Sequence, residues 1–417
     1  MNNAEKTYDV IVVGAGASGL MASSSAAGSG ASCLVLEQKK RPGSKILITG
    51  KGRCNITNDC EIEQVFDNVR RNRRFLYSSI YSFTNDDIIR HFNGLGVTTK
   101  VERGGRVFPI SDKASDVVEA LATDAVKKGA VIHTGMKAAH IIIDDGVVAG
   151  VECSDGTVFH GRNVILACGG ASYPATGSDG SGYLLAREAG HNIIAPRGSL
   201  TGLETSQKWV AGVSGLTLKN VGLGIRKSGK NIFYMQGELL MTHFGISGPI
   251  TLTASAYLAD AGFEDAQASI DLKPALDAEK LDARILRDFT AASNKQFSNS
   301  LGALLPSSLI MPIIAMSGID PVKKCNQITA AERKGLAALL KYISLDITGP
   351  RPLEEAIVTA GGVDVSEINP STLESNLVKG LYFCGEIIDV DANTGGFNLT
   401  IAFSTGRLAG LTSAKAI

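Results

Sequence analysis

The sequence predicts an α/β fold in which a Rossmann-like domain is assembled from both ends of the chain, around a β-barrel-like insertion and a small helical domain. Near the amino terminus, an apolar run from Val10 to Val13 precedes closely spaced glycines, an Ala/Ser-rich stretch and a second apolar run. Residues 380–416 again read as an apolar strand, a glycine-rich loop and an Ala/Gly-rich helix. Between these ends, turn residues recur among β-rich runs at the spacing of a small antiparallel sheet or barrel.

These patterns set the expected domain boundaries. Residues 1–193 and 368–417 are expected to form the nucleotide-binding domain, because strands and helices alternate there. Residues 194–272 and 342–367 are expected to form the β-rich insertion. Residues 273–341 are rich in Ala, Leu and Lys and are interrupted by prolines, which predicts a helical domain. No second complete unit of strand, glycine motif, helix and acid occurs, so a dedicated NAD(P)H domain is not expected.

Composition narrows the classes of partner. The chain has 41 basic and 41 acidic residues, which favours a small-molecule substrate over nucleic acid and gives no case for an anionic membrane. No apolar stretch is long enough for a membrane span. Seven cysteines without a CxxC pair predict a reducing, cytoplasmic location and no metal site. The sequence does not define an oligomeric state.

The amino-terminal motif has the features of a site for an ADP-containing dinucleotide. Gly14 permits a tight turn, Gly16 lets a pyrophosphate approach the backbone, and Gly19 lets the helix pack close to the sheet. The pyrophosphate is expected on the N–H groups at the helix start, with Ala17 and Ser18. Glu37 ends the second strand and can accept hydrogen bonds from the ribose, and Gln38 follows it. This motif alone is equally consistent with NAD and FAD.

The carboxyl-terminal segment favours FAD. Gly385, Glu386 and Asp389 follow a strand, and a second glycine-rich helix start follows them. Glu386 or Asp389 is suited to the ribityl hydroxyls or a pyrophosphate-bound water. The N–H groups of the helix start can face the N1/C2=O edge of a flavin, where reduced flavin carries negative charge; this start comprises Gly396, Phe397, Asn398 and Leu399.

Two other glycine-rich segments complete the predicted cofactor site. The loop over residues 50–58 is polar and can hydrogen-bond a ring system. A strand over residues 163–167 ends at a glycine doublet. The residues predicted to contact the cofactor from these segments and the preceding turn are Lys45, Gly52, Arg53, Cys54, Asn55, Gly169 and Gly170.

Several long motifs resemble the BaiN-like flavoproteins, within the wider two-dinucleotide-binding-type flavoproteins that include fumarate reductases. They are GKGRCNITN, GGRVFPISDKASDV, GGASYPATGSDGSGY, THFGISGP, EEAIVTAGGVDVSEI and GLYFCGEIIDVDANTGGFNLTIAFSTG, which run nearly from end to end. The resemblance implies a discontinuous FAD domain, an inserted barrel-like domain, a helical domain and usually non-covalent FAD. It also implies a flavin oxidoreductase, with enone reduction of bile acids and amine oxidation both assigned within the family. This chain departs from the family at Thr400, where Gln is more common, and at Ala392, where Gly is common.

Three residues are candidates for the chemistry. His243, in a glycine-flanked turn, is either a proton donor or a turn cap. Tyr173 either donates a hydrogen bond to a substrate carbonyl or packs. Arg106, like Arg53, is suited to an anionic group or to reduced flavin.

The leading functional hypothesis is hydride transfer between flavin N5 and a small organic substrate, driven by transiently bound NADH or NADPH. The expected reaction is reduction of an activated C=C of the enone type, as in bile-acid-like substrates. One alternative is an amine or amino-ketone oxidase that uses dioxygen. Another is a non-catalytic FAD-binding protein.

Overall fold

The computed structural model describes residues 7–416, which divide into two compact units. Unit 1 runs to Ser199 and resumes at Leu353, and unit 2 comprises Leu200–Pro352. Unit 2 therefore begins after the boundary expected at 193/194 and ends before the one expected at 367/368. The reason is that β10 (Ile193–Ser199) pairs with β17 (Val358–Val363) inside unit 1 instead of joining the barrel.

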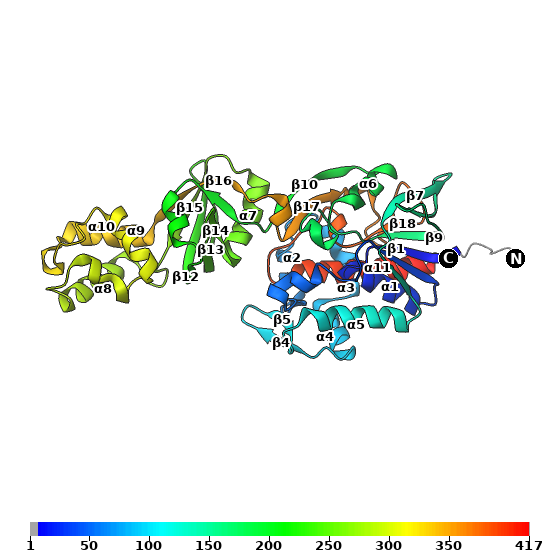
Figure 1. Ribbon diagram of the computed structural model, residues 1–417, viewed down its shortest axis with the longest axis horizontal. Helices are drawn as coiled ribbons and strands as arrows, with labels where there is room; N and C mark the ends of the chain where they lie inside the picture. The colour runs from blue at the N-terminus through cyan, green and yellow to red at the C-terminus, as the bar shows by residue number, and fades with distance from the viewer. Residues whose placement is uncertain (1–6, 417) are drawn as a thin grey trace. The chain divides into compact units, whose positions relative to one another are not determined.

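Unit 1 is built on a seven-stranded sheet (Figure 1). Its path is β6-β2-β1-β9-β8-β7, and β18 pairs with the second half of β9. The strands β6, β2, β1, β9 and β18 are parallel, whereas β8 and β7 are antiparallel additions. The strand bounds are Thr7–Val13 for β1, Cys33–Glu37 for β2, Val131–Thr134 for β6, Ala138–Asp144 for β7, Val147–Cys153 for β8, Val158–Leu166 for β9 and Leu381–Phe383 for β18.

The strand β2 pairs with one side of β1, and β9 pairs with the other side. The strand order therefore reverses between β1 and β9, which makes this position a topological switch point. Ligands of such sheets bind beyond the carboxyl ends of the strands at this point. The glycine-rich segments after Val13, Leu166 and Phe383 all lie at these carboxyl ends. The confirmed α/β fold thus brings three sequence motifs to one edge of one sheet.

Helices cover this sheet around an apolar core of Val, Ile, Leu and Phe side chains. Their bounds are Ala17–Gly28 for α1, Ile62–Asp67 for α2, Tyr77–Ser82 for α3, Asn85–Gly94 for α4, Ala114–Lys127 for α5, Ser181–Glu188 for α6 and Phe397–Lys415 for α11. A small antiparallel sheet joins β3 (Thr57–Asn58), β5 (Arg106–Pro109) and β4 (Thr99–Glu102) in that order.

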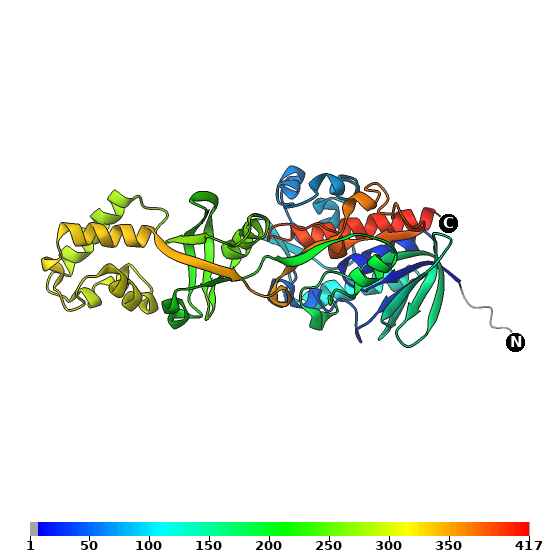
Figure 2. The ribbon, with the colours of Figure 1, turned by 90° about the horizontal axis from the view of Figure 1, so that it is seen from above.

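Two of these helices, α1 and α11, lie in direct backbone contact (Figure 2). A Cβ at Gly406 would overlap the carbonyl oxygen of Ser18, and a Cβ at Gly410 would overlap that of Ala22. Residue numbers rise together along both helices, so the helices run in the same direction. At 1.5 Å per residue, α11 begins roughly 12 Å before α1 along their shared direction.

Unit 2 contains a closed six-stranded barrel, as expected (Figure 1). Its order is β11 (Leu203–Thr205), β14 (Gly245–Ser247), β13 (Lys230–Met241), β12 (Thr217–Lys227), β15 (Ala266–Asp271) and β16 (Ile343–Pro350). The helices are α7 (Pro249–Ala261), α8 (Ala278–Ala291), α9 (Ser307–Ser317) and α10 (Ala330–Lys341). One apolar core runs through barrel and helices, which fall in one compact unit, whereas the sequence suggested two domains.

The helix α7 departs from the expectation of a purely β-rich stretch over residues 194–272. Its first residue is Pro249, preceded by Gly248 at φ +91°. Proline suits the first helical position because its missing N–H would be unpaired there in any case. The helix start was therefore readable from the sequence but masked by the β-rich residues around it.

Within residues 7–416, no helix is both long and apolar enough to cross a membrane. The same residues hold no cluster of three or more metal-ligating side chains. All seven cysteines are free thiols.

Candidate cofactor and active site

The three glycines of the amino-terminal motif have different physical reasons for lacking a side chain. Gly14 has φ +102°, and a Cβ there would lie 2.6 Å from the carbonyl oxygen of Ala167. A Cβ at Gly19 would overlap the carbonyl oxygen of Gly14. A Cβ at Gly16, in contrast, would meet no protein atom within 4 Å. Packing within the chain therefore accounts for Gly14 and Gly19, whereas Gly16 borders open space at the start of α1.

The starts of α1 and α11 are alike, and the starts of α6 and α7 share the same features. The residues before α1 and α11 are Gly16 and Gly396, and no side chain of the described residues caps either helix. Neither first turn contains an acid. The unpaired N–H groups and the positive end of the helix dipole are therefore available to an anion. Two such starts face the same direction, roughly 12 Å apart along the helix axes.

Glu37 organises the glycine-rich loop. Its Oε2 accepts a hydrogen bond from the Ala15 N–H at 2.8 Å, and its Oε1 accepts one from the Lys39 N–H at 2.8 Å. The residue is only 7% exposed, and burial raises the pKa of its carboxyl. A carboxylate can accept about four hydrogen bonds, so capacity remains for the ribose hydroxyls proposed from the sequence.

Lys45 and Glu386 form the centre of a polar network. The Lys45 Nζ lies 2.7 Å from Glu386 Oε2 and donates to Ser172 Oγ at 2.7 Å. The Thr359 N–H donates to Glu386 Oε1 at 2.8 Å. A Cβ at Gly170 would lie 3.2 Å from Glu386 Oε1 and would clash with the Thr359 side chain. The glycine doublet thus makes room for this network.

Asp389 is held in a second polar cluster. Its Oδ1 accepts from the Gly361 N–H at 3.1 Å, and its Oδ2 accepts from the Asn72 side chain at 3.1 Å. The Arg71 guanidinium lies 3.8 Å from the same carboxylate. Burial raises the pKa of Asp389 in spite of that cation. The neighbouring Asp391 accepts from Ser199 Oγ at 2.7 Å.

The loop over residues 50–58 has an unusual backbone. Gly50, Lys51, Gly52 and Cys54 all have positive φ, which is costly for Lys51 and Cys54 because they carry a Cβ. Burial raises the pKa of the Cys54 thiol to about 12, so this thiol stays protonated and unreactive at neutral pH.

Asn55 follows this strained segment. Its Oδ1 is buried and has no hydrogen-bond partner among residues 7–416. An unpaired buried acceptor is costly, so this atom is suited to a donor on a bound ligand.

The same loop lies against the start of α11. A Cβ at Gly396 would overlap the carbonyl oxygen of Thr57, and the Asn58 side chain donates to the Gly395 carbonyl at 2.9 Å. The hydroxyls of Thr57 and Thr400 are hydrogen-bonded at 2.7 Å. The departure from the family pattern at Thr400 is therefore accommodated by Thr57, and Thr400 is fully buried.

Other predicted cofactor residues hold the surrounding loops. The Asn398 side chain donates to the Ala392 carbonyl at 2.8 Å and accepts from the Ala392 N–H at 3.0 Å. Ser18 lies against Gly385, where a Cβ would collide with its hydroxyl. Gln38 donates to the Gly177 carbonyl at 2.6 Å. Phe397 is buried, Leu399 is partly buried, and Gly169 has φ +74°.

The candidate arginines are engaged differently from each other. The Arg53 guanidinium bonds Glu102 at 2.8 Å and lies 4.0 Å above the Phe108 ring. Arg106 donates through Nε to the Arg103 carbonyl at 3.1 Å. Arg53 is thus held by a carboxylate of β4, whereas Arg106 keeps donors that these contacts do not use.

The two candidate proton donors lie in different units. Tyr173, in unit 1, has φ +54°, and its N–H donates to the Glu354 carbonyl at 3.1 Å. His243, in unit 2, is exposed and contacts the Phe244 ring edge-on. The turn around His243 is closed by Thr242, whose hydroxyl donates to the Gly245 carbonyl and accepts from the Gly245 N–H. The turn-capping role weighed for His243 therefore belongs to Thr242.

Sequence reasoning missed several residues that hold the site together: Thr57, Asn72, Ser172, Thr359 and Thr405. Most are small hydroxyl residues in or beside strands, where they look like ordinary β-formers. The sequence signal near Thr359 was the Gly361-Gly362 doublet, which begins two residues later. Glycines are common where the backbone needs a positive φ, and both of these glycines have one.

The fold and the site define the class of protein, a flavoprotein oxidoreductase with a Rossmann-type dinucleotide domain. Residues 8–412 match the family described as HI0933-like protein Rossmann domain, and the chain belongs to that family.

Similar proteins come from several bacteria. The chain is 31% identical to the 3-dehydro-bile acid delta(4,6)-reductase of Clostridium scindens, over 97% of this chain and 98% of that protein. It is 32% identical to the ribosomal RNA dihydrouridine synthase of Haemophilus influenzae, over 97% of this chain and 98% of that protein. The protein of the same name from Escherichia coli is 29% identical over 95% of this chain and 96% of its own length.

Solved structures share the fold. A quinol-fumarate reductase with bound menaquinol matches with a TM-score of 0.51 and 18% identity, over 98% of this chain and 71% of that one. The 3-ketosteroid-delta4-(5alpha)-dehydrogenase of Rhodococcus jostii RHA1 matches with a TM-score of 0.50 and 16% identity, over 99% and 98%. At these identities the likeness concerns the fold alone.

Proposed function

We propose that unit 1 binds FAD along the line from the start of α1 to the start of α11. The observation that carries this proposal is the pair of uncapped helix starts, which face the same way and lie roughly 12 Å apart along their axes. A flavin dinucleotide places negative charge at two separated points, its pyrophosphate and the N1/C2=O edge of its reduced ring. Gly16, Ala17 and Ser18 would hold the first, and Gly396 to Leu399 the second.

Other residues fit the same cofactor. The open space beside Gly16 accommodates a group that a side chain would exclude. The unpaired Asn55 Oδ1 offers an acceptor to a ring N–H next to the α11 start. Glu37 offers spare acceptor capacity to ribose hydroxyls, and Asp389 offers it to ribityl hydroxyls.

The proposed reaction is reduction of a C=C bond conjugated to a carbonyl group. The names of the relatives support it, because they describe one kind of bond. A 3-oxo group with double bonds at positions 4 and 6 is a conjugated dienone. Dihydrouridine is uridine whose ring C=C, conjugated to a carbonyl, has been saturated.

Bound FAD supplies hydride transfer, and the residues of the chain supply position and charge. The C=C gains a hydride at the β-carbon and a proton at the α-carbon, and NADH or NADPH supplies the two electrons. The N–H groups that open α11 stabilise the negative charge of the reduced state. Tyr173 Oη or His243 supplies the proton, and Arg106 offers donors to an anionic group of the substrate.

The substrate class remains divided between two candidates. A small free enone fits the original expectation. The expectation of no nucleic acid rested on a net charge of zero, and two relatives named for ribosomal RNA support uracil within RNA as the second candidate.

An anaerobic stopped-flow experiment tests the proposal. NADH or NADPH should bleach the flavin absorbance of the holoenzyme, and an added enone or uracil-containing RNA should restore it. Failure of both substrate classes to reoxidise the enzyme would contradict the proposed reaction. Stoichiometric peroxide with an amine would support the oxidase instead. A flavin that no donor reduces would support the non-catalytic alternative.

A further inference from the structure

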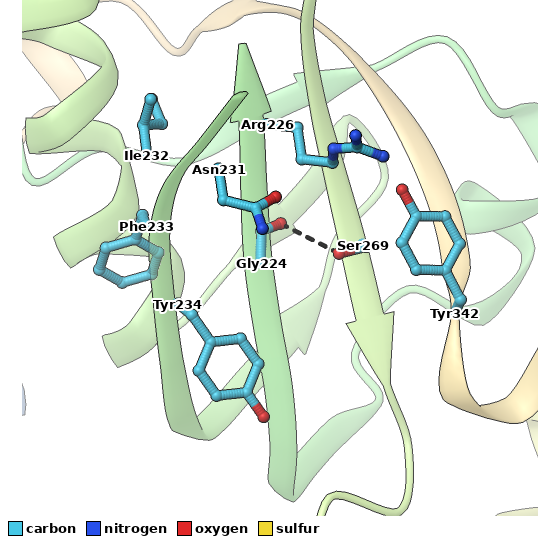
Figure 3. Close-up of a pocket in the computed structure, with 8 residues that line it drawn as sticks. All are labelled: Gly224, Arg226, Asn231, Ile232, Phe233, Tyr234, Ser269 and Tyr342. Atoms are coloured by element: carbon cyan, nitrogen blue, oxygen red, sulfur yellow. Dashed lines mark hydrogen bonds between the residues drawn. The ribbon is translucent and has the colours of Figure 1, made fainter. Parts of the chain in front are cut away.

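The outer face of the barrel in unit 2 carries an open trough of about 550 Å³ (Figure 3). It is lined from β12, β13 and β15 and by Tyr342, which directly precedes β16. Figure 3 shows Tyr234 and Tyr342 on opposite sides of the strands that carry Gly224 and Ser269.

The floor of the trough lacks large side chains. Gly224 pairs with Tyr234 on one side and with Ser269 on the other. Side chains alternate along a strand, so Leu223 and Ile225 fill the barrel core while Gly224 faces outward. A glycine weakens a strand because it has no side chain to pack. At Gly224, between Tyr234 and Ser269, the missing side chain leaves the floor of the trough open.

Tyr234 forms one wall as a flat aromatic surface. Its ring lies over the backbone of β12, because added Cβ atoms would lie 2.7 Å from its hydroxyl at Gly222 and 3.8 Å from its ring at Gly224. The residue is still 60% exposed, and Tyr342 is 45% exposed. One side of the Tyr234 ring thus rests on backbone, and much of the residue faces water. Aromatic side chains presented in this way are stacking platforms for flat rings.

Positive charge gathers at the β12–β13 hairpin beside the trough. Arg226 lines the trough, and Lys227 and Lys230 flank the same turn. Arg226 donates to the Gly229 carbonyl at 3.0 Å, which uses one of its five donors. Two acids lie close to these strands: Glu264 Oε2 is 3.6 Å from Lys227 Nζ, and Asp271 Oδ2 is 2.5 Å from Lys341 Nζ. Because Glu264 offsets the charge of Lys227, a phosphate passing the hairpin would meet chiefly Arg226 and Lys230.

From the aromatic wall, the low floor and the basic hairpin, we propose that this trough binds an unpaired base of single-stranded RNA, with the adjoining phosphate at Arg226. Stacking on Tyr234 holds the base, Tyr342 bounds the opposite side of the trough, and the hairpin holds the backbone. The choice of RNA rests on the proposed function, in which uracil within RNA is a substrate class. The trough is then a binding surface for the RNA that carries the target uracil.

Direct binding measurements test this inference. The probe is a fluorescein-labelled single-stranded U12 RNA, titrated with holoenzyme at low salt and followed by anisotropy. The Tyr234→Ala and Tyr342→Ala variants should each weaken binding at least five-fold, and Tyr234→Phe should restore it, because stacking needs the ring and not the hydroxyl. The Arg226→Ala variant should weaken binding and reduce the slope of log affinity against log salt by about 0.7.

A matched control is Tyr81→Ala, which removes a tyrosine of similar exposure, 57%, from unit 1. It should leave RNA binding unchanged. A duplex RNA of the same length should compete poorly, since its bases are stacked within the helix.

Three results would overturn the inference: no RNA binding by the wild type, equal binding by the tyrosine variants, or equal competition by duplex RNA. Reoxidation of the reduced enzyme by a small soluble enone separates this failure from failure of the proposed function. If the enone works and RNA does not bind, the reaction stands and the trough proposal falls. If RNA binds but no conjugated C=C is reduced, the trough proposal stands and the reaction falls.

Discussion

The glycines of α1 and α11 in unit 1 and the glycine of α10 in unit 2 have opposite surroundings. In unit 1, side chains at Gly19, Gly406 and Gly410 would collide with backbone carbonyls of a neighbouring segment. In unit 2, Gly335 of α10 is exposed, and a Cβ there would meet nothing within 4 Å. The comparison teaches that α1 and α11 of unit 1 come into direct backbone contact, which fixes their starts relative to each other, whereas the glycine of α10 makes no such contact.

Buried charge follows the same division. Among the described residues, the buried carboxylates are Glu37, Asp389 and Asp391, and all three belong to unit 1. Burying a carboxylate is costly unless it is hydrogen-bonded, and each of these accepts hydrogen bonds. In unit 1, these buried carboxylates hold loops together through their hydrogen bonds. The core of unit 2, in contrast, is apolar.

The largest expected effect on stability comes from replacing two helix glycines by alanine, one in close backbone contact and one in open space. Gly406→Ala should lower the free energy of unfolding by about 3 kcal/mol, because the methyl group would force α11 away from Ser18. Gly335→Ala should raise it by about 1 kcal/mol, since Ala favours the helix and the space is open. Urea unfolding of both variants measures the difference. Similar values for the two would break the comparison.

The next effect concerns the Lys45–Glu386 network. Lys45→Met should lower the free energy of unfolding by about 2 kcal/mol, because Glu386 loses its cation while remaining largely buried. The matched control is Lys280→Met, which removes an exposed pair with Asp277 and should have a much smaller effect. Equal costs in urea unfolding would show that the network is an ordinary surface ion pair.

A third change separates packing from ligand binding. Gly16→Ala should leave the unfolding of the apoprotein within about 0.5 kcal/mol of wild type, because the Cβ has room. It should weaken FAD binding at least ten-fold, or about 1.4 kcal/mol, because the methyl group would occupy the space proposed for the pyrophosphate. Fluorescence titration with FAD measures this. Unchanged affinity would remove Gly16 from the cofactor site.

The smallest expected effect is a pH dependence. Burial raises the pKa of Glu37 above its ordinary value of 4.5, so the folded state takes up its proton first as pH falls. The stability of wild type relative to Glu37→Gln should therefore be greatest below pH 4.5 and decrease as pH rises from there through the folded pKa. Urea unfolding of the apoprotein at pH 5, 6 and 7 gives the trend.

Glu332 provides the opposite control. Its hydrogen bonds to Lys323 and Thr329 lower its pKa to about 2, so it stays ionised throughout this range. The difference between wild type and Glu332→Gln should be flat from pH 5 to 7. A flat difference for Glu37→Gln as well would contradict the assigned cost of burial.

The sequence predicted those structural elements around the candidate site that depend on local chain geometry. The turn at Gly14, the helix start at Gly16 and the acid at Glu37 are neighbours along one strand-helix-strand unit, so their spacing was sufficient. The carboxyl-terminal helix start at Gly396 was equally readable. The α/β class and the existence of a barrel followed from periodicity.

What could not be predicted depends on contacts between distant segments. Lys45 and Ser172 meet Glu386 only after the sheet has assembled, and nothing near each residue in sequence marks its partner. Arg53 looked free to bind an anion, but the fold brings Glu102 of β4 beside it. The boundary of the insertion was misplaced because β10 has the composition of a barrel strand and a pairing partner far along the chain.

The pairing of β10 with β17 has a consequence for how such a chain is assembled. Ser199, where the chain leaves unit 1, lies directly opposite Val358, shortly after it returns at Leu353. The two points at which the chain leaves and re-enters unit 1 are thus held close together by hydrogen bonds between β10 and β17. Closing a loop between fixed ends costs only about 0.6 kcal/mol more for each doubling of its length. Unit 1 can therefore accept modules of very different size between these two strands, and the pairing of β10 with β17 stays the same.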